Sequence, residues 1–318
     1  MSNVLILGGT GFVGRSVCEK LVERSGGAGG RITVPSRRPH RAQHIRTLPT
    51  VELVQADVHN DADLRQLVEG CDAVINLVAI LHGSEADFQR VHVDLPRKLV
   101  AACQTHGVKR IVHVSALGAA TDAPSKYLRS KAAGEAILKA AGLDITVLRP
   151  SVIFGEHDRF LNLFARLLAV TPVMPLAGAA ARFQPVWVED VASAIVASIG
   201  DRTSIGQTVE CGGPTVYTLE ALVRFAGRCA GHERPVIALP DAIARLQALV
   251  MGWLPGEPLM SGDNLDSMRV PSVLSGDSPG LEALGIQPAS IEAVMTPLLA
   301  GHAGVARLEP LRASAHRR

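Results

Sequence analysis

The chain has 318 residues, of which 47% are hydrophobic and 19% are charged, and this composition excludes a disordered or polyelectrolyte protein. The formal net charge is only +2 and aromatic residues make up 3%, which argues against a dedicated nucleic-acid binder. A chain of this length can bury a substantial core in one large or two modest domains.

The first half of the chain alternates short apolar segments with amphipathic ones. The pattern predicts strands at residues 4–7, 32–34, 51–54, 73–77, 111–114 and 145–148. It predicts helices at residues 12–24, 62–69, 88–105 and 125–141. Nearly continuous apolar strands that alternate with helices indicate a parallel sheet covered on both faces. The predicted fold class is therefore α/β, with a Rossmann doubly wound parallel sheet.

After residue 150 the alternation gives way to shorter elements separated by prolines. Helices are expected at 188–199 and 219–230, and a strand at 207–211. We expect residues 1–149 to form a dinucleotide-binding Rossmann domain to which residues 184–213 return. Residues 150–183 and 214–300 are predicted to form a smaller, irregular C-terminal lobe for substrate or partner, and residues 301–318 a loose tail.

The strongest local pattern is a glycine turn directly after the first predicted strand. Gly9, Gly11 and Gly14 form a Gly-x-Gly-x-x-Gly sequence between a strand and a helix, as the dinucleotide fingerprint requires. Glycine lets the backbone approach a pyrophosphate closely. The helix that follows offers free N–H groups to an anion. The turn therefore predicts a site for a dinucleotide cofactor.

The loop after the second strand points to the kind of dinucleotide. A site for NAD usually places an acidic residue here, to bind the ribose 2′-hydroxyl. No acidic residue occurs between Arg24 and Val51, whereas Arg37 and Arg38 follow the strand directly. Guanidinium groups suit a 2′-phosphate, so the sequence predicts NADP(H). The alternative is a solvated basic loop.

Several segments together resemble the short-chain dehydrogenase/reductase superfamily. They are the glycine turn, residues 56–58, residues 76–79, the Tyr127-x-x-x-Lys131 pair and residues 187–192. Residues 113–118, 125–131 and 149–162 are most similar to its atypical branch, in particular the NADPH-binding accessory subunit of respiratory complex I and its bacterial relatives. The resemblance covers about residues 3–215.

This resemblance implies cofactor contacts at the matching positions. Gly8, Gly11 and Gly14 would hold the pyrophosphate, Arg37 or Arg38 the 2′-phosphate, Asp57 and Val58 the adenine, and Tyr127 and Lys131 the nicotinamide ribose. The other implied cofactor contacts are Thr10, Phe12, Val13, Val78, Ala79 and Pro150. No metal site is expected, because no histidine or cysteine group has ligand spacing.

Tyr127 and Lys131 are the candidate catalytic pair, with Ser115 as a third candidate. Residues four apart share a helix face, and an ammonium beside a phenol is expected to lower the pKa of Tyr127 and ready it for proton transfer. Family members that catalyse carry a serine or threonine where this chain has Leu117, and a helix asparagine where it has His92. Ser115 or Ser125 would have to take over the role of the missing polar residues. The incomplete polar set suits tight cofactor binding with slow or absent turnover.

Two functions remain open at this point. One is a respiratory-chain or quinone-linked accessory protein that holds NADPH with little or no turnover. The other is an NADPH-dependent reductase of a carbonyl or quinone-like small-molecule acceptor, with Tyr127 as proton donor. Residues 1–7 lack signal-peptide features and no apolar run reaches the about 18 residues of a membrane span. We expect a cytoplasmic protein, or one peripheral to the inner membrane with a membrane-bound respiratory partner.

An apolar stripe in the predicted C-terminal lobe has two interpretations. Ile243, Leu246, Leu249, Val250 and Trp253 recur at three- and four-residue spacing. Such stripes usually face the core. Alternatively, the tryptophan end lines the mouth of an acceptor site or touches a membrane-bound partner.

Overall fold

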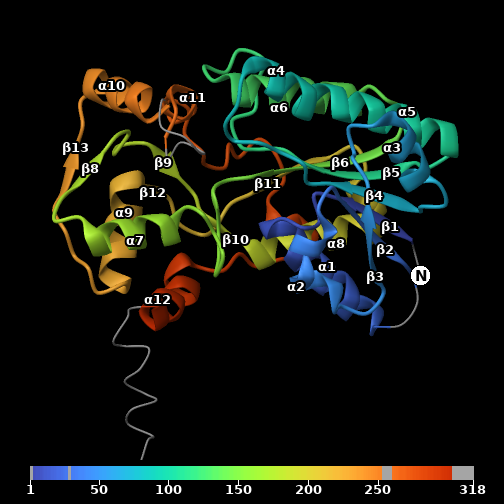
Figure 1. The fold of residues 1–318 in the computed structure, drawn as a ribbon, viewed down its shortest axis with the longest axis horizontal. Helices are drawn as coiled ribbons and strands as arrows, with labels where there is room; N and C mark the ends of the chain where they lie inside the picture. Colours follow the sequence, from blue (N-terminus) through green and yellow to red (C-terminus); the bar gives the residue numbers. More distant parts are fainter. Residues whose placement is uncertain (1–2, 28–29, 253–259, 303–318) are drawn as a thin grey trace, which may run out of the picture. The chain divides into compact units, whose positions relative to one another are not determined.

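The structure is a computed structural model that describes residues 3–27, 30–252 and 260–302, and it divides into two compact units (Figure 1). The first unit comprises Met1–Ser151, Val188–Gly212 and Leu274–Gln287. The second unit comprises Val152–Trp187, Gly213–Val273 and Pro288–Arg318.

The first unit contains a seven-stranded sheet with the order β11-β6-β5-β4-β1-β2-β3, in which every pairing is parallel. The strands are β1 Val4–Leu7, β2 Ile32–Ser36, β3 Val51–Gln55, β4 Ala73–Asn76, β5 Arg110–Val114, β6 Asp144–Pro150 and β11 Thr208–Cys211. All residues of β1 and β4 are buried, as expected for central strands covered on both faces. The predicted Rossmann fold is confirmed.

Helices cover both faces of this sheet (Figure 1). α1 (Phe12–Ser25) and α8 (Val188–Gly200) pack together on one face. α3 (Asp61–Val68), α5 (Leu95–His106) and α6 (Lys126–Lys139) pack on the other. Leu5, Leu7, Leu99 and Ile111 belong to the buried cluster between this second layer and the sheet. The short helix α2 (Gln43–Arg46) lies between β2 and β3 in the chain.

One part of the C-terminal region returns to the first unit, so its expected place in the smaller lobe is wrong for residues 274–287. The cause is a polar anchor on β11. The buried Glu210 accepts hydrogen bonds from the Ser275 backbone at 2.7 Å and from its hydroxyl at 3.0 Å. The Glu210 N–H donates in turn to the Pro279 carbonyl at 2.9 Å. Glu210 and Ser275 lie too far apart in the sequence for a local pattern to reveal this anchor.

The predicted helix at residues 88–105 is interrupted by a π-helical turn, Gln89–Asp94, between α4 (Glu85–Phe88) and α5. Pro96 has no N–H for the helical bond to the carbonyl of residue 92, and its ring crowds that carbonyl, so the helix widens here. The His92 carbonyl then points at α6, where only Gly134 allows the approach. A Cβ at position 134 would overlap the His92 carbonyl oxygen.

Gly134→Ala should therefore destabilise the protein, although glycine-to-alanine changes inside a helix usually stabilise. We expect a loss of about 1–3 kcal/mol in the free energy of unfolding, the scale of overpacking a core. Urea denaturation would measure it. Ala136→Ser, at an exposed position of the same helix, is the control and should change little. A Gly134→Ala protein as stable as the wild type would contradict this close contact.

The second unit is built from short strand pairs and helices. Its strands are β7 (Ile153–Phe154) with β10 (Val186–Trp187), β8 (Met174–Leu176) with β13 (Val236–Ala238), and β9 (Arg182–Phe183) with β12 (Tyr217–Thr218). Its helices are α7 Leu161–Val170, α9 Leu219–Cys229, α10 Asp241–Gly252, α11 Gly262–Ser267 and α12 Ile291–His302. Phe154, Leu161, Leu222 and Met295 lie in its core.

The apolar stripe of α10 does not face that core in its first two turns. Ile243 is 51% exposed and Leu246 is 61% exposed, whereas Ala244 is buried. The helix packs through its small residue, so the interpretation of a core-facing stripe is wrong for Ile243 and Leu246. The side chains of Leu249 and Val250, and all of Trp253, lie outside the described part. Within that part, no helix is long and apolar enough to cross a membrane.

Candidate functional site

The glycines of the turn between β1 and α1 differ in why the position is a glycine. Gly8 has φ +81°, which favours glycine, and a Cβ at Gly14 would lie 2.6 Å from the Gly8 carbonyl oxygen. The fold itself therefore requires both. Gly11, the N-cap of α1, is exposed, and a Cβ there would meet only the Gly8 oxygen, at 3.3 Å. Since the fold leaves space at Gly11 and no side chain caps α1, the turn is open to an anion.

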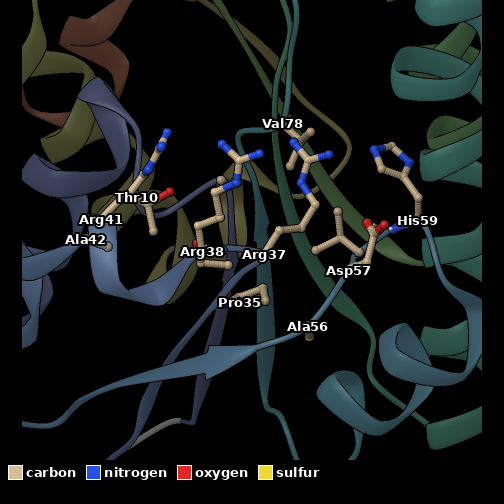
Figure 2. Close-up of a pocket in the computed structure, with 13 residues that line it drawn as sticks. Thr10, Pro35, Arg37, Arg38, Arg41, Ala42, Ala56, Asp57, His59 and Val78 are labelled. Atoms are coloured by element: carbon tan, nitrogen blue, oxygen red, sulfur yellow. Dashed lines mark hydrogen bonds between the residues drawn. The ribbon is translucent and has the colours of Figure 1, made fainter.

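A cavity of about 570 Å³ opens beside this turn (Figure 2). Its lining residues come from the ends of β1, β2, β3 and β4 and the loops that follow, where the carboxyl ends of parallel strands meet. They are Gly8, Thr10, Pro35, Ser36, Arg37, Arg38, Arg41, Ala42, Ala56, Asp57, Val58, His59 and Val78.

Three arginine side chains reach into the cavity. In the view of Figure 2 their order is Arg41, Arg38, Arg37, with Thr10 at the Arg41 end and Asp57 at the Arg37 end. The Arg41 N–H donates to the Arg38 carbonyl at 3.0 Å. Both side chains therefore belong to one tight turn, Pro39–Arg41 with Arg38 as its N-cap. No described carboxylate forms an ion pair with any of the three guanidinium groups. Such a group of free cations can bind a phosphate.

The opposite wall of the cavity is formed by the loop after β3. The Asp57 N–H donates to Asp63 Oδ2 at 2.8 Å, and the His59 N–H donates to Asp57 Oδ1 at 3.0 Å. Burial lowers the pKa of His59, and although Asp57 opposes this shift, the nearby Arg37 adds to it. The imidazole is therefore neutral at neutral pH.

The two members of the Tyr127/Lys131 pair have different surroundings. Lys131, on α6, is buried, and its Nζ donates to the Val114 carbonyl at 2.7 Å. Burial lowers the pKa of Lys131 to about 8, against the opposing effect of Glu135. The Tyr127 ring packs edge-on against Phe88 and His92, with ring centroids 6.2 and 5.6 Å away. Burial raises the pKa of Tyr127 to about 12.

The expected lowering of the pKa of Tyr127 by Lys131 is therefore wrong in this structure. Helical spacing correctly places both residues on α6. The shift nevertheless has the opposite sign, because burial among rings disfavours the phenolate.

His92 connects the loop after β4 to α6. Its Nε2 accepts from the Ile80 N–H at 3.1 Å, and its Nδ1 lies 2.8 Å from the Ser130 hydroxyl, which itself donates to the Tyr127 carbonyl at 2.7 Å. This pattern assigns the proton of the ring to Nδ1. Burial, together with Lys131, lowers the pKa of His92 to about 3. His92 is thus a neutral structural link.

The remaining predicted site residues lie outside the cavity lining. Ser115 follows β5 and is buried, with its N–H bonded to the Leu148 carbonyl at 2.7 Å. Pro150, at the end of β6, is also buried, and Ala79 is exposed in the loop after β4. The other predicted residues outside the lining are Gly11, Phe12, Val13, Gly14, Tyr127 and Lys131.

Sequence reasoning missed some cavity residues as site residues, above all Arg41 and His59. A signal for Arg41 was present, since Pro39 favours a tight turn that brings residues three apart to one side. A signal for His59 was its place in the loop after the third strand, directly beyond Asp57 and Val58. The fold and this site define a dinucleotide-binding Rossmann protein.

Comparison with known proteins identifies the dinucleotide class and the family. Residues 8–165 match a family model described as NAD(P)H-binding. The chain is 33% identical to mitochondrial NADH dehydrogenase [ubiquinone] 1 alpha subcomplex subunit 9 of Mus musculus, over 93% of this chain and 79% of that protein. It is 32% identical to the ceramide reductase of Caulobacter vibrioides, over 79% of this chain and 78% of that protein.

Among solved structures, the chain is similar to an NADPH-dependent quinone oxidoreductase of Escherichia coli. The TM-score is 0.70 and the identity 20%, over 96% of this chain and 99% of that one. At this identity the likeness concerns the fold. The family model in turn shows an NAD(P)H-binding protein. The chain belongs to the family of the complex I alpha subcomplex subunit 9 proteins.

Proposed function

We propose that this protein binds NADPH in the first unit and holds it as a tightly bound ligand, in an accessory role linked to the respiratory chain or to quinone. The observation that carries the proposal is the set of three guanidinium groups that face one cavity beside the glycine turn and pair with no carboxylate of the described residues. A 2′-phosphate supplies the negative charge that these groups lack, whereas NADH does not.

Within this site we assign the 2′-phosphate to Arg38 and Arg41. These two side chains come from one turn, and in Figure 2 Arg41 lies beside Thr10 of the glycine turn, with Arg38 next to it. Arg37 lies toward Asp57 and is close enough to His59 to affect its pKa. We assign Arg37 to the adenine, over which a guanidinium can stack.

Little or no turnover is supported by the surroundings of Tyr127. A phenol packed against Phe88 and His92, with its pKa raised to about 12, is poorly prepared to exchange a proton at neutral pH. His92, with a pKa lowered to about 3, is not a proton source at that pH. Bound NADPH would then serve as a structural or redox-sensing ligand.

The second candidate function is an NADPH-dependent reductase of a carbonyl or quinone-like molecule. It is favoured by the Tyr127/Lys131 pair on one helix and by the similarity to a protein named ceramide reductase. NADPH would supply the hydride, and Tyr127 would donate the proton.

One experiment separates these functions. The protein is purified, its co-purifying nucleotide is identified by mass spectrometry, and oxidation of the bound NADPH is followed with a panel of carbonyl compounds and quinones. The accessory role predicts about one NADP(H) per chain and no acceptor-dependent oxidation. Rapid multiple turnover with any acceptor would instead establish the reductase.

If the protein is a reductase, Tyr127→Phe should abolish turnover and change NADPH affinity by less than about 1 kcal/mol, because only the proton donor is lost. Steady-state kinetics and a binding titration on the same preparation would measure both quantities. Lys131→Ala should reduce both turnover and affinity. A reductase whose rate is unaffected by Tyr127→Phe would refute the proton-donor role.

We also propose a membrane-bound respiratory partner, which would place the protein at the periphery of the inner membrane. The support is the family and the exposed Ile243 and Leu246 on α10, since apolar side chains of this size suit a contact surface. Sedimentation with respiratory membranes, but not with protein-free vesicles of the same lipids, is the expected result. Ile243→Ser combined with Leu246→Ser should abolish it. Failure to sediment with respiratory membranes would count against such a partner.

A further inference from the structure

A set of buried charged side chains lies around and beyond Lys131 in the first unit. We propose that Glu135, held by Arg149, is a positioning residue that acts through Lys131 and keeps its ammonium charged for the ribose of the bound cofactor. This inference rests on the proposed NADPH-binding function, and it adds two residues that do not line the nucleotide cavity.

The carboxylate of Glu135 has a fixed orientation. Glu135 lies one turn after Lys131 on α6, so the two share a helix face. Its side chain is 3% exposed. Arg149, on β6, binds it with both arms of the guanidinium, from Nε to Oε1 at 2.9 Å and from Nη2 to Oε2 at 2.7 Å. A bidentate pair of this kind holds a carboxylate firmly.

Opposite charges are neighbours along this set. Arg149 lies opposite Glu210 on the neighbouring strand β11, and Glu210 is itself bound by Ser275. The buried Lys131 and the half-buried Arg149 accompany two buried carboxylates, Glu135 and Glu210, and the exposed Lys139 also pairs with Glu135. An unpaired buried charge is costly, so removing one member changes the electrostatic environment of the others.

Three other titratable groups around Lys131 are neutral at neutral pH. Burial lowers the pKa of His92 to about 3 and lowers that of His113, and it raises the pKa of Tyr127 to about 12. Lys139, a cation one turn beyond Glu135, bonds the same carboxylate at 3.2 Å. Among the described groups that influence the charge of Lys131, Glu135 is the one that favours the ammonium form.

Removing Glu135 and removing Arg149 should have opposite effects on Lys131. Without the carboxylate, burial acts unopposed and the ammonium loses its proton at lower pH. Without Arg149, the carboxylate of Glu135 is less neutralised, so the ammonium keeps its proton to higher pH. A purely structural pair would behave differently, because breaking it from either side would weaken cofactor binding without moving the pH dependence.

The test is NADPH affinity measured from about pH 6 to about pH 9 by the fluorescence of the bound cofactor. Because the pKa of Lys131 is lowered to about 8, wild-type affinity should fall as the pH rises through that value. The midpoint should move down by about one pH unit in Glu135→Gln and up in Arg149→Met. Lys131→Met should remove this pH dependence in every background.

Two further measurements keep the outcome decisive. The double variant Glu135→Gln/Arg149→Met removes both charges of the pair, which is better tolerated than breaking it, and should also show the lower midpoint. NMR of ¹³C-labelled lysines follows the titration of Lys131 without cofactor, with Lys131→Met identifying its signal. Midpoints that stay unchanged, or that move in one direction in both single variants, would overturn the inference. Failure of the wild type to bind NADPH would instead refute the proposed function, and the lysine titration would still test the role of Glu135.

Discussion

Gly11→Val should weaken NADPH binding strongly and leave the fold largely intact. Gly11 is exposed at the start of α1, and a Cβ there meets only the Gly8 oxygen, at 3.3 Å. The fold can therefore accept a side chain at this position. A branched side chain would occupy the space through which the pyrophosphate reaches the N–H groups of the helix. We expect affinity for NADPH and NADH to fall by about 100-fold or more, which corresponds to about 2.7 kcal/mol.

The matched control for this prediction is Gly14→Ala in the same turn. A Cβ there would lie 2.6 Å from the Gly8 oxygen, so this smaller change should lower the melting temperature, whereas Gly11→Val should not. Calorimetric titration measures binding, and thermal unfolding measures the fold. Undiminished NADPH binding by a folded Gly11→Val protein would contradict the assigned phosphate site.

Arg38→Ala combined with Arg41→Ala should cost about 3 kcal/mol of NADPH affinity and change NADH affinity far less. The estimate takes about 1.5 kcal/mol for each charged hydrogen bond to the 2′-phosphate. The loss should be smaller at high salt, because salt screens exposed charges. Arg37→Ala should weaken both cofactors by similar factors, since the adenine that it contacts is common to them.

Arg46→Ala is the control for these variants, because Arg46 is an exposed arginine of the same segment that does not line the cavity. It should leave both affinities unchanged. If Arg37→Ala weakens NADPH alone while the Arg38/Arg41 variant weakens both cofactors, the assignments of the arginines must be exchanged. If no arginine variant alters the preference between the cofactors, the 2′-phosphate does not bind here.

Much of the first unit could be predicted from the sequence, because its elements are locally determined. The strand Val4–Leu7 has the predicted bounds, and an apolar run that ends in glycines leaves few other conformations. The predicted helices at 12–24 and 125–141 differ from α1 and α6 by no more than two residues at either end. The same local pattern located the glycine turn and the basic loop.

The features that could not be predicted depend on contacts between distant residues or on burial. The apolar periodicity does not reveal the π-helical turn Gln89–Asp94. This turn precedes α5, whose second residue is Pro96. The apolar stripe identified which residues of α10 share a face, but packing through Ala244 decides that Ile243 and Leu246 remain exposed. The pKa of Tyr127 follows its burial near Phe88, which the spacing to Lys131 does not reveal.

We propose that the cavity beside the glycine turn selects NADPH through Arg38 and Arg41. The most direct test is calorimetric titration of the nucleotide-free wild-type protein with NADPH and with NADH in the same low-salt buffer. We expect at least about tenfold tighter binding of NADPH, equivalent to about 1.4 kcal/mol. Equal affinities for the two cofactors would contradict it.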